Sequence, residues 1–147
     1  MEPIASTECN HDFSFGLAKY RGSALTTGSY WGSSACNVKT EIYDFENDHW
    51  NDAPDYPYAR FSISNDFQKY ILNIIFSRIV RYATASTPDS AFIIGGWDGS
   101  TKSDLIARFQ NNEWSQYGTL HRRRAGPGSV TFGNQTLIIG GWTDDGR

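Results

Sequence analysis

The sequence predicts an all-β fold built from short strands and tight turns. Two features of its composition support this class: aromatic residues make up 15% of the 147-residue chain, and 14 residues are glycine. Aromatic side chains favour strands, and glycine favours the turns between them. A formal net charge of −3 is too small to indicate a polycation that binds nucleic acid. We therefore expect an all-β chain with no nucleic-acid partner.

The third feature is an internal repeat. Residues 91–97 and 136–142 are near copies, each an apolar run followed by Gly-Gly-Trp, and they lie 45 positions apart. Residues 41–50 align without gaps on residues 105–114, with Ile, Phe, Asn and Trp in common. Short apolar strands that recur at this spacing are typical of propeller blades rather than of helical solenoids.

Turn residues divide the chain into three groups of expected strands. A polar turn at 46–48 lies in the first group, a similar turn at 110–112 lies in the second, and Gly133-Asn134 is the tight turn of the third. The expected strands are 15–19, 23–27, 40–43 and one that begins near Trp50, then 82–86, 91–94, 105–108 and 114–117, then 129–132 and 137–139.

The glycine pairs, with the tryptophans and arginines that follow them, resemble the kelch repeat. In that pattern a strand ends in Gly-Gly, a later strand ends in Tyr-Asp, and Trp and then Arg follow. Thr27 stands where the first glycine of one pair is expected, and Ala107-Arg108 stand where Tyr-Asp is expected. The residues that carry the repeat motif are Gly28, Tyr43, Asp44, Trp50, Arg60, Gly95, Gly96, Trp114, Arg124, Gly140 and Gly141.

The resemblance implies four-stranded antiparallel blades of a β-propeller. We expect a poorly ordered N-terminal segment at 1–12, kelch-like blades at 13–60 and 80–124, and a partial third blade at 125–147. Closed propellers need about four to eight blades, so we expect an incomplete propeller. Further blades or self-association would be needed to close it.

Residues 61–79 interrupt the repeat. The longer pair of similar segments is 64 positions apart, 19 more than the other pair. Polar residues recur near a helical period here, which favours a short amphipathic helix over 67–80. The insertion is a lid or partner-binding helix, a surface insertion without a role, or translated non-coding sequence. Because its removal restores the repeat, the last interpretation is favoured.

The cysteines and the N-terminus indicate little about the compartment. Cys9 and Cys36 have no regular metal-binding spacing, so two unpaired cysteines are favoured over a zinc site, and a disulfide stays possible in an oxidising compartment. No basic start with an apolar run marks a signal peptide, and the longest apolar cluster, 71–80, is too short to span a membrane. A cytoplasmic location is slightly favoured. The glycosylation sequon that begins at Asn134 matters only in a secreted protein.

No catalytic arrangement, metal site or cofactor site emerges from the sequence. We expect Arg60 and Arg124 to bond strand-end carbonyls, and Trp50 and Trp114 to pack between blades. The function most favoured is a protein-interaction module, and the alternatives are a fragment of a propeller enzyme of oxidase or hydrolase type and a non-functional product of an incorrect gene model. Loops carry recognition in such scaffolds, and the candidate partner-binding residues are Trp97, Asp98, Arg122, Trp142 and Thr143.

Overall fold

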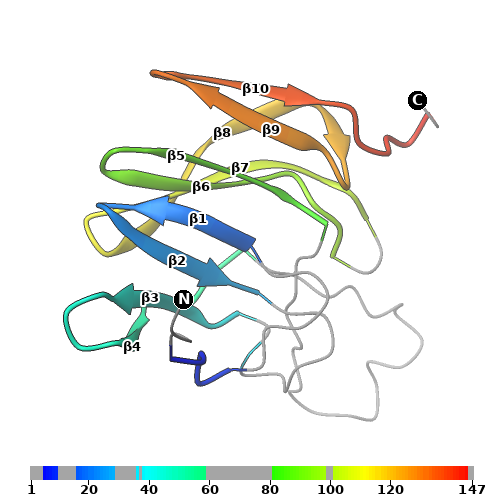
Figure 1. The fold of residues 1–147 in the computed structure, drawn as a ribbon. Coiled ribbons are helices and arrows are strands. Elements are labelled where there is room, and N and C mark those ends of the chain that lie inside the picture. The colour runs from blue at the N-terminus through cyan, green and yellow to red at the C-terminus, as the bar shows by residue number, and fades with distance from the viewer. Residues whose placement is uncertain are drawn as a thin grey trace, which may run out of the picture.

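The computed structural model describes residues 5–9, 16–28, 36, 38–58, 81–98 and 101–145. Within these residues the chain forms ten β-strands and no helix, so the all-β prediction is confirmed. The strands make two four-stranded antiparallel sheets and one two-stranded sheet, which lie side by side in Figure 1. The expected insertion at 61–79 and Arg60 lie outside the described residues.

The first sheet pairs its strands in chain order. Arg21 and Gly22 both have positive φ angles, 48° and 83°, as a two-residue turn between antiparallel strands requires. In the turn at 45–48, the Asp44 carboxylate accepts the backbone N–H groups of Glu46 at 2.8 Å and Asn47 at 3.2 Å. The four strands are β1 (Gly16–Tyr20), β2 (Ser23–Thr27), β3 (Thr40–Asp44) and β4 (His49–Ala53).

The second sheet repeats this order. Asn111 and Asn112 form its last turn with φ angles of 52° and 62°, which asparagine tolerates better than most residues. The final strand runs to Arg124, well beyond the expected end at 117. The four strands are β5 (Ala83–Thr87), β6 (Ser90–Ile94), β7 (Ser103–Gln110) and β8 (Glu113–Arg124).

The third sheet is the hairpin of β9 (Gly128–Phe132) and β10 (Gln135–Ile139). Gly133 has a φ angle of 58°, so the turn falls where Gly133-Asn134 predicted it. In the described part of the chain, β10 pairs with β9 and with no other strand. The outer edge of β10 therefore presents unpaired backbone groups.

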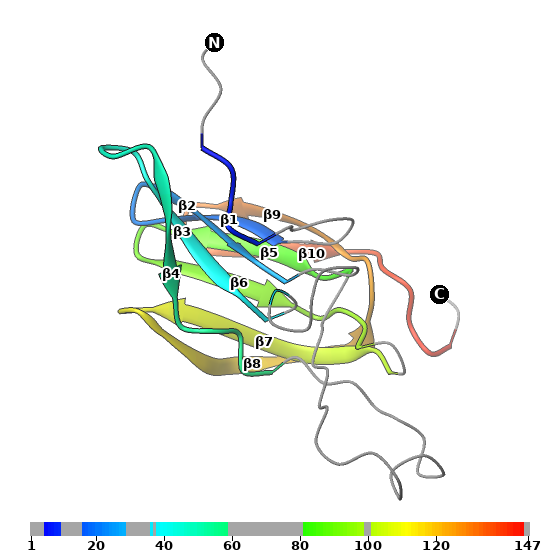
Figure 2. The ribbon, with the colours of Figure 1, turned by 90° about the horizontal axis from the view of Figure 1, so that it is seen from below.

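The first strands of the three sheets lie next to one another, as both views show (Figures 1 and 2). Side chains tie these strands together. The Thr84 hydroxyl of β5 donates to the Leu17 carbonyl of β1 at 2.9 Å, and the Ser129 hydroxyl of β9 donates to the Thr84 carbonyl at 2.5 Å. The three sheets thus meet along their first strands and diverge from there, and over the described residues they do not close on one another.

The main core lies between the first two sheets. Its largest fully buried apolar side chains are Phe109, Leu25 and Ile93, each at most 1% exposed. The ring of Tyr20 meets that of Phe109 edge to face, with centroids 5.0 Å apart. Burial of this size holds the two sheets together as one unit.

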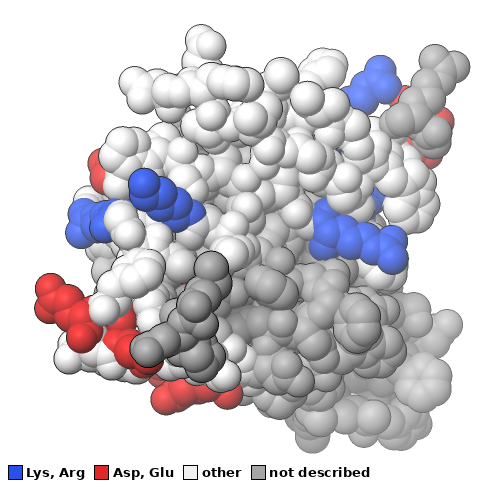
Figure 3. Space-filling view, in the orientation of Figure 1, with Lys and Arg blue, Asp and Glu red and all other residues white. Residues whose placement is uncertain are grey.

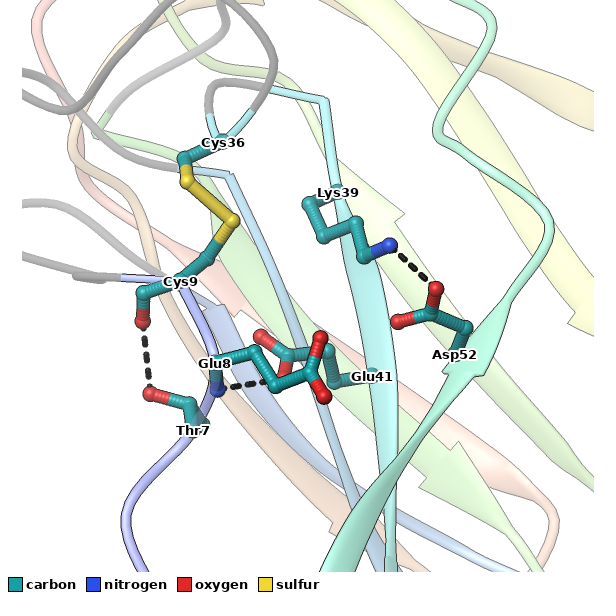
Figure 4. Close-up of a disulfide and its surroundings, with 7 residues drawn as sticks. All are labelled: Thr7, Glu8, Cys9, Cys36, Lys39, Glu41 and Asp52. Atoms are coloured by element: carbon teal, nitrogen blue, oxygen red, sulfur yellow. Dashed lines mark hydrogen bonds and ion pairs between the residues drawn. A yellow bond between two sulfur atoms is a disulfide. The ribbon is translucent and has the colours of Figure 1, made fainter.

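A disulfide joins Cys9 to Cys36, and their Cα atoms are 5.4 Å apart (Figure 4). The expectation that these cysteines are unpaired is wrong, because the N-terminal segment folds back onto the first sheet. The Glu8 backbone N–H donates to the buried Glu41 carboxylate of β3 at 2.9 Å. Residues 5–9 of the segment expected to be poorly ordered are therefore held by both a covalent and a hydrogen bond.

Candidate binding site

The candidate site begins at the two glycine pairs, which follow β6 and β10. All four glycines have positive φ angles. A Cβ atom on Gly95 would lie 2.8 Å from the Arg124 carbonyl oxygen, and one on Gly141 would lie 3.1 Å from the Ala125 carbonyl oxygen. The Gly96 N–H donates to the Arg124 carbonyl at 2.9 Å. The missing side chains let the end of β8 pass against both pairs.

Arg124 links the second and third sheets through its side chain as well. Its Nη1 donates to the carbonyl of Gly140 at 2.6 Å, at the strand end of the next sheet. This is the contact that a structural role for Arg124 requires. Gly28, the motif glycine of the first sheet, has a φ angle of 79° at the equivalent end of β2.

Trp97 and Trp142 each come directly after a glycine pair, and each tryptophan forms an isolated β-bridge. Trp97 bridges Lys102, and Trp142 bridges Ala125 through hydrogen bonds of 2.7 and 3.0 Å. Lys102 brings the two loops together, because its ammonium lies 3.9 Å from the centre of the Trp142 ring and 2.7 Å from the Asp144 carboxylate. Sequence reasoning missed Lys102, since an isolated lysine in a loop carries no pattern.

A second ion pair lies on the same loop. Arg122 Nη1 is 2.5 Å from the Asp145 carboxylate, and both side chains are about half exposed. The Thr143 hydroxyl also donates to Asp145. Thr143 itself is buried, at 5% exposed, so its side chain orders the loop from within. Of the predicted residues, Trp142 and Thr143 therefore share one loop, and Arg122 of β8 contacts this loop through Asp145.

Trp97 and Asp98 are less exposed than Trp142. Both are intermediate in exposure, and the guanidinium of Arg81 lies 5.7 Å from the centre of the Trp97 ring. Asp98 accepts hydrogen bonds from the backbone N–H of Thr101 at 2.7 Å and from its hydroxyl at 3.0 Å. It also lines a polar groove of about 320 Å³ with Lys102. Asp98 therefore shapes its own turn and borders the groove.

An uncharged apolar surface adjoins this loop. No Asp, Glu, Lys or Arg occurs from residue 127 to residue 142. The hairpin side chains that are 40–67% exposed are Val130, Phe132, Leu137 and Ile139. Figure 3 shows the corresponding upper part of the molecule without charged atoms, and Lys, Arg, Asp and Glu appear at its right-hand end. Exposed apolar surface of this kind marks interaction sites.

Both tryptophans of the repeat motif form hydrogen bonds through their indole N–H groups; Trp114 is buried, and Trp50 is intermediate in exposure. The Trp114 indole N–H donates to the Pro54 carbonyl at 3.0 Å, so this side chain of the second sheet reaches the first. The Trp50 indole N–H donates to the Ala5 carbonyl, also at 3.0 Å.

The Tyr43 hydroxyl donates to Asp48, and this bond raises the pKa of Tyr43 and lowers that of Asp48. Asp44 has a lowered pKa because Asn47 and Glu46 donate to it.

Two other kinds of site are absent from the described part of the chain. No group of three or more His, Cys, Asp or Glu side chains is placed there to hold a metal ion. No helix there is long and apolar enough to cross a membrane. No protein-family model matches the sequence, and a search of curated proteins finds no match.

Proposed function

We propose that the three sheets are blades of a kelch-like β-propeller and that the chain is a protein-interaction module. Support for the propeller comes from contacts that recur at motif positions. Trp50 and Trp114 make the same 3.0 Å indole-to-carbonyl bond. Gly95 and Gly140 have the same φ angle of 66°. Further blades or a second copy of the chain would cover the open edge of β10.

One observation carries the interaction function: the ring of Trp142 is 55% exposed yet held in place. Lys102 lies over one face of the ring, and the backbone bridge to Ala125 fixes the residue. Exposed tryptophans are frequent hot spots of protein interfaces. A side chain that is already ordered loses less conformational entropy when a partner binds.

The charges around Trp142 favour a partner that is itself a protein surface. Lys102 pairs with Asp144, and Arg122 pairs with Asp145, so each of these two positive groups is matched by a carboxylate of the Trp142 loop. This arrangement resembles the polar rim of an interface around an apolar centre. The partner would place a small apolar pocket over Trp142 and hydrogen-bonding groups against the rim.

The test uses a partner identified by proximity labelling with the wild-type chain and then purified. Trp142→Ala should weaken its affinity about 30-fold, as expected for a hot spot worth about 2 kcal/mol. Tyr117→Ala is the matched control, because Tyr117 is also an aromatic residue, is 61% exposed and lies on β8 outside this loop. Equal binding by wild type and Trp142→Ala would refute the proposed site.

A further inference from the structure

The hairpin turn between β9 and β10 contains the sequence Asn134-Gln135-Thr136. This is an acceptor sequence for N-linked glycosylation, because it is Asn-x-Thr and the middle residue is not proline. Both Asn134 and Thr136 are exposed. The side-chain amide therefore lies at the tip of the hairpin, where a bulky group can be attached without displacing a buried side chain.

The disulfide is a second, independent observation that points to the same modification. Cys9 and Cys36 are paired, and the cysteines in the described part of the chain include no free thiol. Stable disulfides form in oxidising compartments and are rare in the cytosol. The endoplasmic reticulum is one such oxidising compartment, and it is where N-linked glycans are added.

The surface beside the turn has the chemistry to receive a sugar ring. A depression of about 490 Å³ is lined by Phe132, Gln135, Thr136 and Leu137. Phe132 is 67% exposed and Leu137 is 53% exposed. The C–H face of a pyranose is apolar and packs on an aromatic ring, while its hydroxyls meet polar groups such as the Gln135 amide. A glycan here would shield apolar surface that is otherwise open to water.

We propose that Asn134 carries an N-linked glycan whose first sugar packs over Phe132. In the transfer, Asn134 Nδ2 forms a bond to C1 of the sugar and loses one proton. The bond from C1 to the oxygen of a lipid-linked diphosphate donor breaks, and the diphosphate leaves with the electron pair. Trp142 lies beyond the opposite end of β10, so the glycan leaves the Trp142 loop open to the proposed partner and covers only the part of the apolar hairpin surface next to the turn.

The experiment uses the protein isolated from the cells that produce it. Because trypsin cleaves after arginine, it releases residues 125–147 as one peptide, in which Asn134 is the sole asparagine. Removal of the glycan by peptide N-glycosidase in H₂¹⁸O should convert Asn134 to Asp with one heavy oxygen. Thiol alkylation without reduction should leave Cys9 and Cys36 unlabelled. An unmodified Asn134 overturns the proposal, whether the cysteines are paired or free.

Matched variants secreted from human cells test the sequence requirement and the packing. Thr136→Ala should abolish the glycan, and Thr136→Ser should retain it, and both changes are at an exposed site. The glycan should raise the melting temperature of the wild type relative to the same protein after deglycosylation. This difference should shrink in Phe132→Ser. A glycan that persists in Thr136→Ala, or an unchanged difference in Phe132→Ser, contradicts the corresponding part of the proposal.

Discussion

The contact that should matter most for stability is the packing of Trp114 between the first two sheets. Its side chain is 7% exposed, and its ring lies 4.9 Å from that of Tyr56 and 5.0 Å from that of Phe109, measured between centroids. Its indole N–H donates to the Pro54 carbonyl at 3.0 Å. Trp114→Ala therefore removes both an inter-sheet ring cluster and an inter-sheet hydrogen bond.

The expected magnitude follows from these contacts. Truncation of a buried tryptophan to alanine costs about 3 to 5 kcal/mol, because transfer free energy is lost and a cavity remains. Trp114→Phe keeps most of the ring but removes the donor, so it should cost about 1 to 2 kcal/mol. Small domains have only about 5 to 15 kcal/mol of stability in total. Trp114→Ala should therefore leave a large unfolded fraction at moderate urea concentrations.

Urea unfolding followed by circular dichroism measures both variants, with free energies from linear extrapolation. Trp142→Ala is the matched control, because its side chain is 55% exposed and should cost about 0.5 kcal/mol or less. Trp114→Phe should fall between wild type and Trp114→Ala. If Trp114→Ala is no less stable than Trp142→Ala, Trp114 does not join the two sheets.

Three further perturbations test other parts of the fold. In urea unfolding, the double variant Cys9→Ser, Cys36→Ser should lose about 3.5 kcal/mol of unfolding free energy. This is the loop-closure value for a separation of 27 residues. Reductant should lower the unfolding free energy of the wild type by the same amount. Asp48 has a lowered pKa in the folded state, so its stabilising effect is present above its ordinary value of 3.8 and is lost as the pH falls through the folded pKa. Unfolding midpoints of Asp48→Asn should therefore depend less on pH below 3.8 than those of wild type, and parallel curves would contradict this. Gly95→Ala should destabilise the protein by about 2 kcal/mol or more, since its φ angle is 66° and a Cβ would meet a carbonyl at 2.8 Å. Gly126→Ala, with a φ angle of 65° and open space around its Cβ, should cost less in the same assay, and equal losses would show that the close approach is unimportant.

Strand positions were predictable wherever turn residues bounded an apolar run. The strand over 23–27 begins and ends as expected, because a glycine turn precedes it and Gly28 follows it. The end of β8 was not predictable. Residues 118–124 are mostly polar or basic and lack the alternation of a half-buried strand. They extend the sheet because Arg124 pairs with Ser103 across a register shift, and this is a tertiary contact.

The candidate site was predictable only in part, for a related reason. Trp142 and Arg122 could be predicted as candidate partner-binding residues from their residue types and from their positions relative to the repeat. Lys102 becomes important only because the fold places it over Trp142, 40 residues further along the chain. The disulfide was missed for the same reason, since the spacing of Cys9 and Cys36 does not reveal that the N-terminal segment folds back.

The N-terminal segment that folds back onto the first sheet also contacts Trp50. Trp114 in the second sheet donates its indole N–H to Pro54, which belongs to the segment that follows the first sheet. Trp50, its equivalent in the first sheet, donates in the same way to Ala5, at the same distance of 3.0 Å. Residues 5–9 thus accept the indole N–H of the tryptophan in the first sheet. The segment after β4 accepts the indole N–H of the tryptophan in the second sheet in the same way. These residues thereby fix the Trp50 indole against the first sheet. A segment this short buries little area by itself, and the disulfide supplies the constraint that holds it there.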